Sequence, residues 1–225
     1  MSSRRRKQQV REMSRIAAEK FNARIRAYKE IVDLIKSGSD EELAARIRQA
    51  VEEKSDLRFY GAFGGYSLLH TAAENDRAEA AAILVREAGF DVDILANFNR
   101  TPLHAAGIFC AAQAAKTLIS LGAEVDARDE DGNTPLQRAA CYAKETDDKN
   151  FETIKILLDA GANPHAKDIF HLEPVNWFET EQAQRRFLAL IGEESEKLPP
   201  RFMFCNGELI LADWYESLSN GEFEG

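Results

Sequence analysis

Apolar residues near the start of the chain recur at steps of three and four. The members of this stripe are Val10, Met13, Ala17, Phe21, Ile25, Tyr28, Val32 and Ile35. Such spacing places side chains on one face of an α-helix, and Arg and Lys fill the other sides. The sequence therefore predicts an amphipathic helix from about Gln8, preceded by a disordered segment Met1–Lys7. We expect this helix to dock on the end of the structure that follows.

A helix break and a new start follow this stripe. Ser37-Gly38-Ser39-Asp40 combines a helix-ending glycine with a capping serine, and acidic residues come directly afterwards. A serine cap and acids in the first turn both favour a helix start. Leu43, Ile47 and Val51 continue the apolar pattern at helical spacing, which predicts a second helix.

The middle of the chain repeats a phrase. Thr101-Pro-Leu-His104 returns as Thr134-Pro-Leu-Gln137, 33 residues later, and a related phrase begins at Ser67, 34 residues earlier. Helical patterns follow, and Gly-Ala closes those that begin at Thr101 and Thr134. A period of this length is typical of stacked supersecondary units, none of which can bury its apolar face alone.

Each part of the phrase has a physical reading. The threonine caps the first helix of a unit, and the proline occupies a position where no backbone donor is needed. Gly122 and Gly161 suit the left-handed residue that ends an outer helix. In its phrases and spacing the sequence resembles the ankyrin repeat. The resemblance implies an all-α fold, an ankyrin-repeat solenoid, here with an N-terminal amphipathic helix and a C-terminal β-hairpin extension.

The resemblance divides the chain into three parts. Residues 1–30 form the basic arm and amphipathic helix, residues 31–192 the ankyrin repeat domain, and residues 193–225 the C-terminal extension. Within the repeat domain we expect a cap at 31–62, repeats at 63–96, 97–129 and 130–168, and a degraded cap at 169–192. About six extra residues, 144–149, form a polar loop in the third repeat. Asn206-Gly207 between two apolar runs predicts the hairpin.

Charge is distributed unevenly along the chain. Residues 1–30 carry a net charge of +7, and the remaining 195 residues carry −16. Nucleic acid or an anionic membrane is therefore a partner only for the first thirty residues. No apolar run approaches the ~18 residues of a membrane span, and the basic start lacks the apolar core of a secretory signal. Three cysteines without metal spacing favour the reducing cytoplasm. The sequence leaves open whether the chain is an effector that is exported without a classical signal peptide.

The sequence offers no active site. His70 and His104 occupy equivalent positions, where the resemblance implies structural hydrogen bonds. His165 and His171 lack the spacing of a metal or hydrolytic site. Gly61-Ala-Phe-Gly64-Gly65 is not followed by the Lys-Ser/Thr of a phosphate loop. We therefore predict a non-catalytic protein with no cofactor, no metal and no small-molecule substrate.

The resemblance also implies where a partner protein binds. Ankyrin stacks usually hold partners on a concave side that is lined by loop tips and inner helices. The positions of this chain that match the family's variable surface are Phe63, Tyr66, Asn97, Phe98, Arg100, Ile108, Phe109, Glu130, Asp131, Asn133, Tyr142 and Phe170. Six of them are aromatic, so we expect an aromatic-lined groove with acidic edges that belongs to an adaptor, an inhibitor or an effector.

Three alternatives remain open at the level of sequence. The basic N-terminal helix could anchor the chain to an anionic membrane or a nucleic acid while the repeats recruit a protein. The chain could be an accessory subunit of an enzyme complex, which predicts an exposed apolar face on the N-terminal helix or the hairpin. Either terminal segment could also fold back and cover the aromatic residues.

Overall fold

The computed structural model describes residues 3–53, 57, 65–143, 148–193, 197–205 and 208–211. Helix α1 (Ser3–Ser37) is continuous and is followed by α2 (Asp40–Glu52). The prediction that Met1–Lys7 is disordered is thus wrong from Ser3 onward. Arg, Lys and Gln are good helix formers, and nothing in this stretch breaks the helix. The expected domain boundary after residue 30 falls inside α1.

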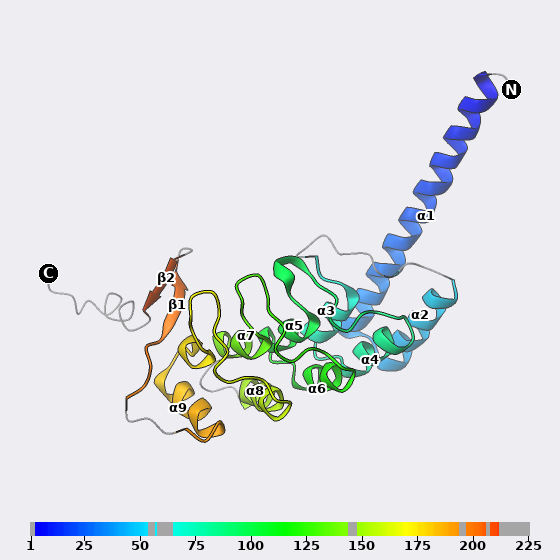
Figure 1. The fold of residues 1–225 in the computed structure, drawn as a ribbon. Helices are drawn as coiled ribbons and strands as arrows, with labels where there is room; N and C mark the ends of the chain where they lie inside the picture. The colour runs from blue at the N-terminus through cyan, green and yellow to red at the C-terminus, as the bar shows by residue number, and fades with distance from the viewer. Residues whose placement is uncertain are drawn as a thin grey trace.

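Only the last part of α1 packs on the rest of the molecule. Tyr28, Ile31 and Ile35 are buried in the core, whereas residues 11–23 are exposed throughout. Figure 1 shows the earlier part of the helix extending well beyond the stack of helix pairs. The expected docking therefore applies to one end of α1 only.

The remaining helices form a row of pairs (Figure 1). The pairs are α3 (Leu68–Glu74) with α4 (Ala78–Arg86), α5 (Pro102–Ile108) with α6 (Ala112–Ser120), and α7 (Pro135–Cys141) with α8 (Asp148–Asp159). A last pair joins the 3-10 helix η2 (Pro174–Trp177) to α9 (Glu181–Leu190), and a short 3-10 turn, η1 (Asn97–Asn99), precedes α5. The first helices of the pairs pack side by side, as do α4, α6 and α8. The predicted all-α solenoid is confirmed.

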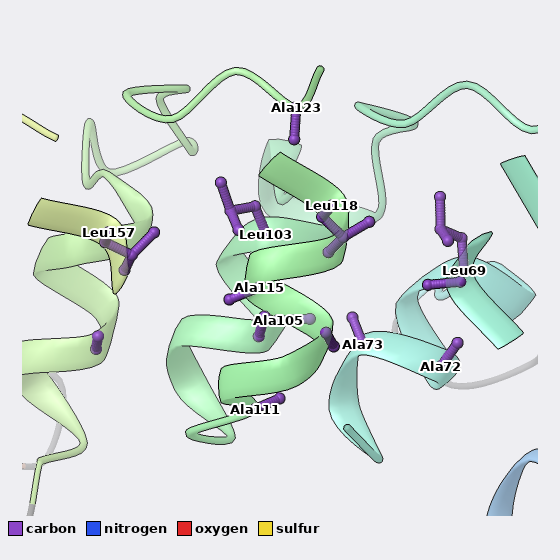
Figure 2. Packing of buried hydrophobic residues seen from close by; sticks show 14 of the residues in the cluster. Leu69, Ala72, Ala73, Leu103, Ala105, Ala111, Ala115, Leu118, Ala123 and Leu157 are labelled. Carbon is purple, nitrogen blue, oxygen red and sulfur yellow. The ribbon is translucent and has the colours of Figure 1, made fainter. Parts of the chain in front are cut away.

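Small residues let the pairs approach closely. Leu103, Leu118 and the alanines Ala105 and Ala115 belong to one continuous buried cluster (Figure 2). A Cβ added at Gly107 would lie 2.6 Å from the carbonyl oxygen of Pro135, so α5 and α7 meet at backbone distance there. Each buried leucine contributes about 2–5 kcal/mol relative to alanine. The stack is therefore stabilised by a row of leucines between closely spaced backbones.

The predicted helix caps are present. The side chains of Ser39, Ser67, Thr101 and Thr134 each accept a hydrogen bond from the backbone N–H three residues on. Gly122 and Gly161 have φ angles of 95° and 92°, the left-handed conformation expected after an outer helix. Local sequence thus specifies where each helix starts and where several of them end.

The fourth unit departs from the others. Its inner element, η2, is one short turn that ends at the buried Trp177, and the next residue, Phe178, is also buried. The Phe178 ring packs against Phe151 and Phe187, so large aromatic rings fill the space that alanines fill elsewhere. Of the expected insertion, residues 144–147 lie outside the described residues, and Asp148 and Lys149 already belong to α8.

Two short strands lie beyond the last pair. Strand β1 (Phe202–Cys205) pairs antiparallel with β2 (Glu208–Leu211), with Phe202 opposite Leu211. The Asn206-Gly207 turn that the sequence predicts lies outside the described residues. Across the described parts of the chain, no helix is both long and apolar enough to cross a membrane.

Candidate functional site

Two buried histidines connect neighbouring repeats. His70 Nδ1 lies 2.9 Å from Ser67 Oγ, and its Nε2 lies 2.9 Å from the carbonyl oxygen of Arg100. His104 makes the same pair of contacts with Thr101 Oγ1 and the Asn133 carbonyl oxygen, at 2.9 and 3.0 Å. Burial lowers the pKa of each histidine to about 4, so both rings are neutral near pH 7. The predicted structural role of these residues is confirmed.

The third repeat achieves the same connection without histidine. Gln137 Oε1 accepts from the Thr134 backbone N–H at 3.0 Å, and its Nε2 donates to the Leu172 carbonyl at 2.9 Å. In each of these three repeats, a buried side chain of the inner helix therefore holds the loop that leads into the next repeat.

The loop tips also bind one another through the backbone. The Glu130 N–H donates to the Phe98 carbonyl at 2.9 Å, and the Ile169 N–H donates to the Asp131 carbonyl at 3.1 Å. Phe98 has a φ of 62° and Asn99 a φ of 54°, so the tip of the second repeat uses two left-handed residues. Phe98 is 59% exposed, and the Arg100 guanidinium lies 5.3 Å from the centre of its ring.

A second row of aromatic residues follows the inner helices. Phe109 and Tyr142 are the C-cap residues of α5 and α7, and they are 46% and 47% exposed. The exposed residues of the loop tips form the first row. We call these residues and the two helix-end residues together the aromatic surface. It comprises Phe98, Phe109, Tyr142, Ile169 and Phe170, all of which are exposed.

Tyr66 links the aromatic surface to the core. Its ring stacks on His70, with 5.1 Å between the ring centres, and its backbone carbonyl accepts from the Tyr28 hydroxyl. Burial raises the pKa of Tyr66, and the neighbouring Glu74 and Tyr142 raise it further, while Arg100 lowers it. These neighbours come from three repeats, so the electrostatic environment of Tyr66 is set by all three.

A buried ion-pair network fixes the loop of the third repeat to α7. Asp129 is buried and accepts hydrogen bonds from Arg138 Nε at 2.6 Å and from the Asn133 N–H at 3.0 Å. Arg138 also donates to the Asp131 carboxylate at 2.7 Å. Burial opposes the charge of Arg138, but the two carboxylates raise its pKa above the ordinary value. Arg100 approaches Asp129 from the previous repeat at 3.8 Å, beyond hydrogen-bond distance.

Sequence reasoning missed this network. The available signal is Arg138 itself, because a long charged residue occupies the inner-helix position that Thr71 and Ala105 fill in the earlier repeats. A charged residue at a position expected to be small and buried indicates a buried partner.

The structure places the predicted binding residues in three groups. Asn97, Phe98, Phe109, Glu130, Tyr142 and Phe170 are exposed, whereas Tyr66, Arg100, Ile108 and Asp131 are partly buried. The expectation that Asn133 lies at the surface is wrong, since this residue is only 3% exposed. Hydrogen bonds of its backbone to Asp129 and His104 hold it inside the repeat. Phe63 lies outside the described residues.

In the described part of the chain, the other reactive groups do not assemble into a reaction centre. Cys141 is exposed at the end of α7, and partial desolvation raises the pKa of its thiol, which disfavours the thiolate. Among the described residues no three His, Cys, Asp or Glu side chains come together in a way that could hold a metal ion. The described geometry is that of a surface for contact.

Sequence comparisons agree with this geometry. A family model of ankyrin repeats in three copies matches residues 25–129 and 69–168. Neurogenic locus notch homolog protein 1 is 37% identical over 114 residues in Xenopus laevis and 32% identical over 142 residues in Homo sapiens, or 50% and 63% of this chain. NF-kappa-B inhibitor alpha of Gallus gallus is 31% identical over 120 residues, or 46% of this chain.

The matches cover only a part of each relative. They span 4–5% of the two Notch proteins and 38% of the NF-kappa-B inhibitor. Ankyrin repeats generally form a non-catalytic interaction fold, so these relatives support a protein-interaction module. With the family model covering more than half of its length, and the repeat geometry present in the structure, this chain belongs to the ankyrin-repeat family.

Proposed function

We propose that the chain is a non-catalytic adaptor, inhibitor or effector that holds a partner protein in the concave groove of its repeats. The observation that carries the proposal is the aromatic surface, whose side chains are between 39% and 59% exposed. Aromatic residues dominate the energetics of protein interfaces, and each can contribute about 2 kcal/mol or more when a partner buries it fully.

The rigidity of this surface supports the proposal. Phe98 and Ile169 belong to loop tips that are bonded to their neighbours, and the network of Asp129 and Arg138 anchors the tip between them. A backbone that is already fixed loses little conformational freedom on binding, so the remaining entropy cost is that of the side chains. A partner would therefore meet a surface that is already in its binding conformation.

The charges at this surface favour one chemistry of partner. Glu74, Glu130 and Asp131 lie at or beside this surface together with Arg100 and Arg128, while the buried Asp129 and Arg138 pair with each other. Glu130 is exposed and Asp131 is partly exposed at the loop tip. A partner with apolar anchors beside basic residues would complement this arrangement.

The relatives suggest a mode of action. One of them is named an inhibitor of NF-kappa-B, and a repeat stack that covers a partner can act in the same way. We extend only the general mode, namely occupation of a partner's surface, to this chain. The cytoplasm is the compartment that we propose for it.

The test is an affinity capture from the native cell with three forms of the full chain. These are the wild type, Phe98→Ala/Phe109→Ala/Tyr142→Ala, and the control Leu95→Ala/Leu190→Ala, which removes exposed apolar side chains outside the aromatic surface. Mass spectrometry identifies the captured protein, and its affinity is then measured with purified components. We expect the triple variant alone to lose the partner, with affinity falling about 1,000-fold or more. Equal binding by all three folded forms would contradict the proposal.

A further inference from the structure

The first half of α1 presents a surface that the repeats do not use. Met13 is 70% exposed and Ile16 is 41% exposed, and the neighbouring Ala17 is exposed as well. Phe21 and Arg24, further along the helix, already make interactions, so the available surface ends before them. We call residues 3–20 the arm. In Figure 1 it extends beyond the stack of helix pairs.

The apolar residues of the arm lie on one side of the helix. At 100° per residue, Met13 and Lys20 are within about 60° of Ala17. Ile16 is about 100° from Ala17 and lies at the edge of the same side. This side of the arm, which we call the apolar face, therefore combines apolar residues with one lysine.

The acids of the arm lie on its other side. Glu12 and Glu19 both pair with Arg15, at 2.8 Å and 3.9 Å. These three residues are about 140–160° from Ala17 on the helix. Since no other acid occurs between residues 3 and 20, the apolar face carries no negative charge.

The arm is basic although the whole chain is acidic. It holds seven Lys or Arg and two Glu, a net charge of +5, and four of the basic residues are consecutive at positions 4–7. Because the chain as a whole carries −9, the residues outside the arm carry −14. An anionic surface would thus attract the arm and repel the rest of the molecule.

We propose that the arm lies along an anionic lipid surface and holds the repeats next to it. Clustered Lys and Arg on an amphipathic helix are attracted to acidic headgroups, while the apolar side enters the boundary with the acyl chains. Lys20 fits this position, since its methylene groups can stay with the apolar residues while its ammonium group reaches a headgroup. The inference is independent of the function proposed for the aromatic surface.

The fold presents the arm in a suitable way. Tyr28, Ile31 and Ile35 are buried and fix the later part of α1 to the stack. The arm adds about 27 Å of helix at ~1.5 Å per residue, which is several times the Debye length of about 8 Å at physiological salt. The far turns of the arm can therefore meet a lipid surface with little repulsion from the acidic repeats.

Other occupants fit the arm less well. A coiled coil with a second copy would place Lys20 in the same seam as Met13, seven residues earlier, and would bring two charges of +5 together. A nucleic acid binds basic residues through its phosphates and would leave Met13 and Ile16 in water. Only a lipid surface uses both the charge and the apolar face.

The test is co-sedimentation of the full chain with phosphatidylcholine vesicles that contain or lack phosphatidylserine, at low and at physiological salt. We expect the wild type to bind only the vesicles with phosphatidylserine, and more weakly as the salt rises. Replacement of residues 4–7 (Arg4→Gln/Arg5→Gln/Arg6→Gln/Lys7→Gln) should weaken binding about 100-fold or more, because four charges are lost near the surface.

A second variant separates the apolar face from the charge. Met13→Gln/Ile16→Gln keeps the net charge and the helix propensity, and it should weaken binding about 10-fold or more. Gln8→Ala/Asn22→Ala is the matched control on the other side of α1, and it should bind like the wild type. Circular dichroism establishes that each variant is folded.

Fluorescence reports which side of the arm enters the lipid. Met13→Trp and Gln8→Trp place the same indole on opposite sides of the helix, and the native tryptophans contribute equally to both variants. Brominated lipids quench only indoles within the acyl region. We expect additional quenching, relative to the wild type, in Met13→Trp and not in Gln8→Trp.

Three results would overturn the inference: no binding of the wild type to vesicles with phosphatidylserine, undiminished binding by Met13→Gln/Ile16→Gln, or equal quenching at the two indoles. A wild type that ignores vesicles but binds a nucleic acid duplex, with loss in the variant of residues 4–7, would assign the arm to nucleic acid instead. Self-association lost in Met13→Gln/Ile16→Gln would assign it to a second copy. The partner capture described above does not depend on any of these outcomes.

Discussion

Inner helices α5 and α7 begin with the same Thr-Pro-Leu phrase and then diverge. The second repeat continues with His104 and Gly107, and the third continues with Gln137 and Ala140 at the equivalent positions. Yet His104 and Gln137 make the same two contacts, one to the capping threonine and one to a carbonyl of the following loop. The geometry needs an acceptor and a donor at fixed positions, and either side chain supplies them.

The two repeats differ more in charge. The third repeat places Arg138 between Asp129 and Asp131, where the second repeat has only Ala105. The inner helix of the second repeat is thus linked to the next loop by neutral hydrogen bonds and close packing, and that of the third repeat has an ion-pair network in addition. Four predictions test this difference, from the largest expected effect to the smallest.

Among single substitutions, removal of the arginine of the network should lower the free energy of unfolding most. Arg138→Met leaves the buried Asp129 carboxylate with only backbone donors, and we expect a loss of about 3 kcal/mol in the free energy of unfolding. Urea denaturation followed by circular dichroism measures it. The double variant Asp129→Asn/Arg138→Met should be more stable than the single variant, because no buried charge is left. A single variant as stable as the wild type would show that the network is energetically neutral.

Acid should destabilise the histidine-linked repeats. His70 and His104 have a pKa of about 4 when folded, against an ordinary value of 6.5, so the unfolded chain binds more protons between these limits. Each histidine therefore contributes stability above pH 6.5 that falls by up to about 3 kcal/mol as the pH drops toward 4.

The third repeat supplies the control for this pH dependence. His104→Gln introduces the residue that already serves at position 137, so it should keep the hydrogen bonds and flatten the loss of stability between pH 6.5 and 4. Denaturation midpoints across this pH range measure the effect. An unchanged pH profile in His70→Gln/His104→Gln would mean that other groups control the acid response.

Close packing should be tested at Gly107. A methyl group there would meet the Pro135 carbonyl oxygen, so we expect Gly107→Ala to destabilise the protein by about 2 kcal/mol, although alanine is the better helix former. The reciprocal change Ala140→Gly should cost about 1–2 kcal/mol, because it adds backbone entropy to the unfolded chain and removes a buried methyl group. Thermal unfolding distinguishes the two. A stabilising Gly107→Ala would show that the helices can separate without cost.

The smallest effect on stability should come from the aromatic surface. Phe109→Ala and Tyr142→Ala remove side chains that are nearly half exposed, and each should change the free energy of unfolding by less than about 0.5 kcal/mol. Their effect should appear in partner binding instead. A large loss of stability in either variant would identify these rings as part of the core.

The repeat architecture was predictable because it depends on local rules. Capping by Thr101, the left-handed Gly122 and the spacing of the phrases follow from short stretches of sequence. The start of α1 was not predicted, because a run of basic residues is compatible with both disorder and helix. The burial of Asn133 could not be predicted either, since it results from contacts with Asp129 and His104 in the folded repeat.

By itself the sequence determined the family, the register of the units, the caps and the absence of a recognisable catalytic motif, since each of these depends on residues close together in the chain. The tertiary structure alone decided which surface residues are exposed and which are engaged. It showed that Phe98 and Tyr142 face outward while Tyr66 lies against His70, and that Asp129 and Arg138 form a buried pair. It also showed that α1 extends beyond the stack of helix pairs. These outcomes depend on how neighbouring repeats pack, because burial is a property of the assembled stack and not of a single unit.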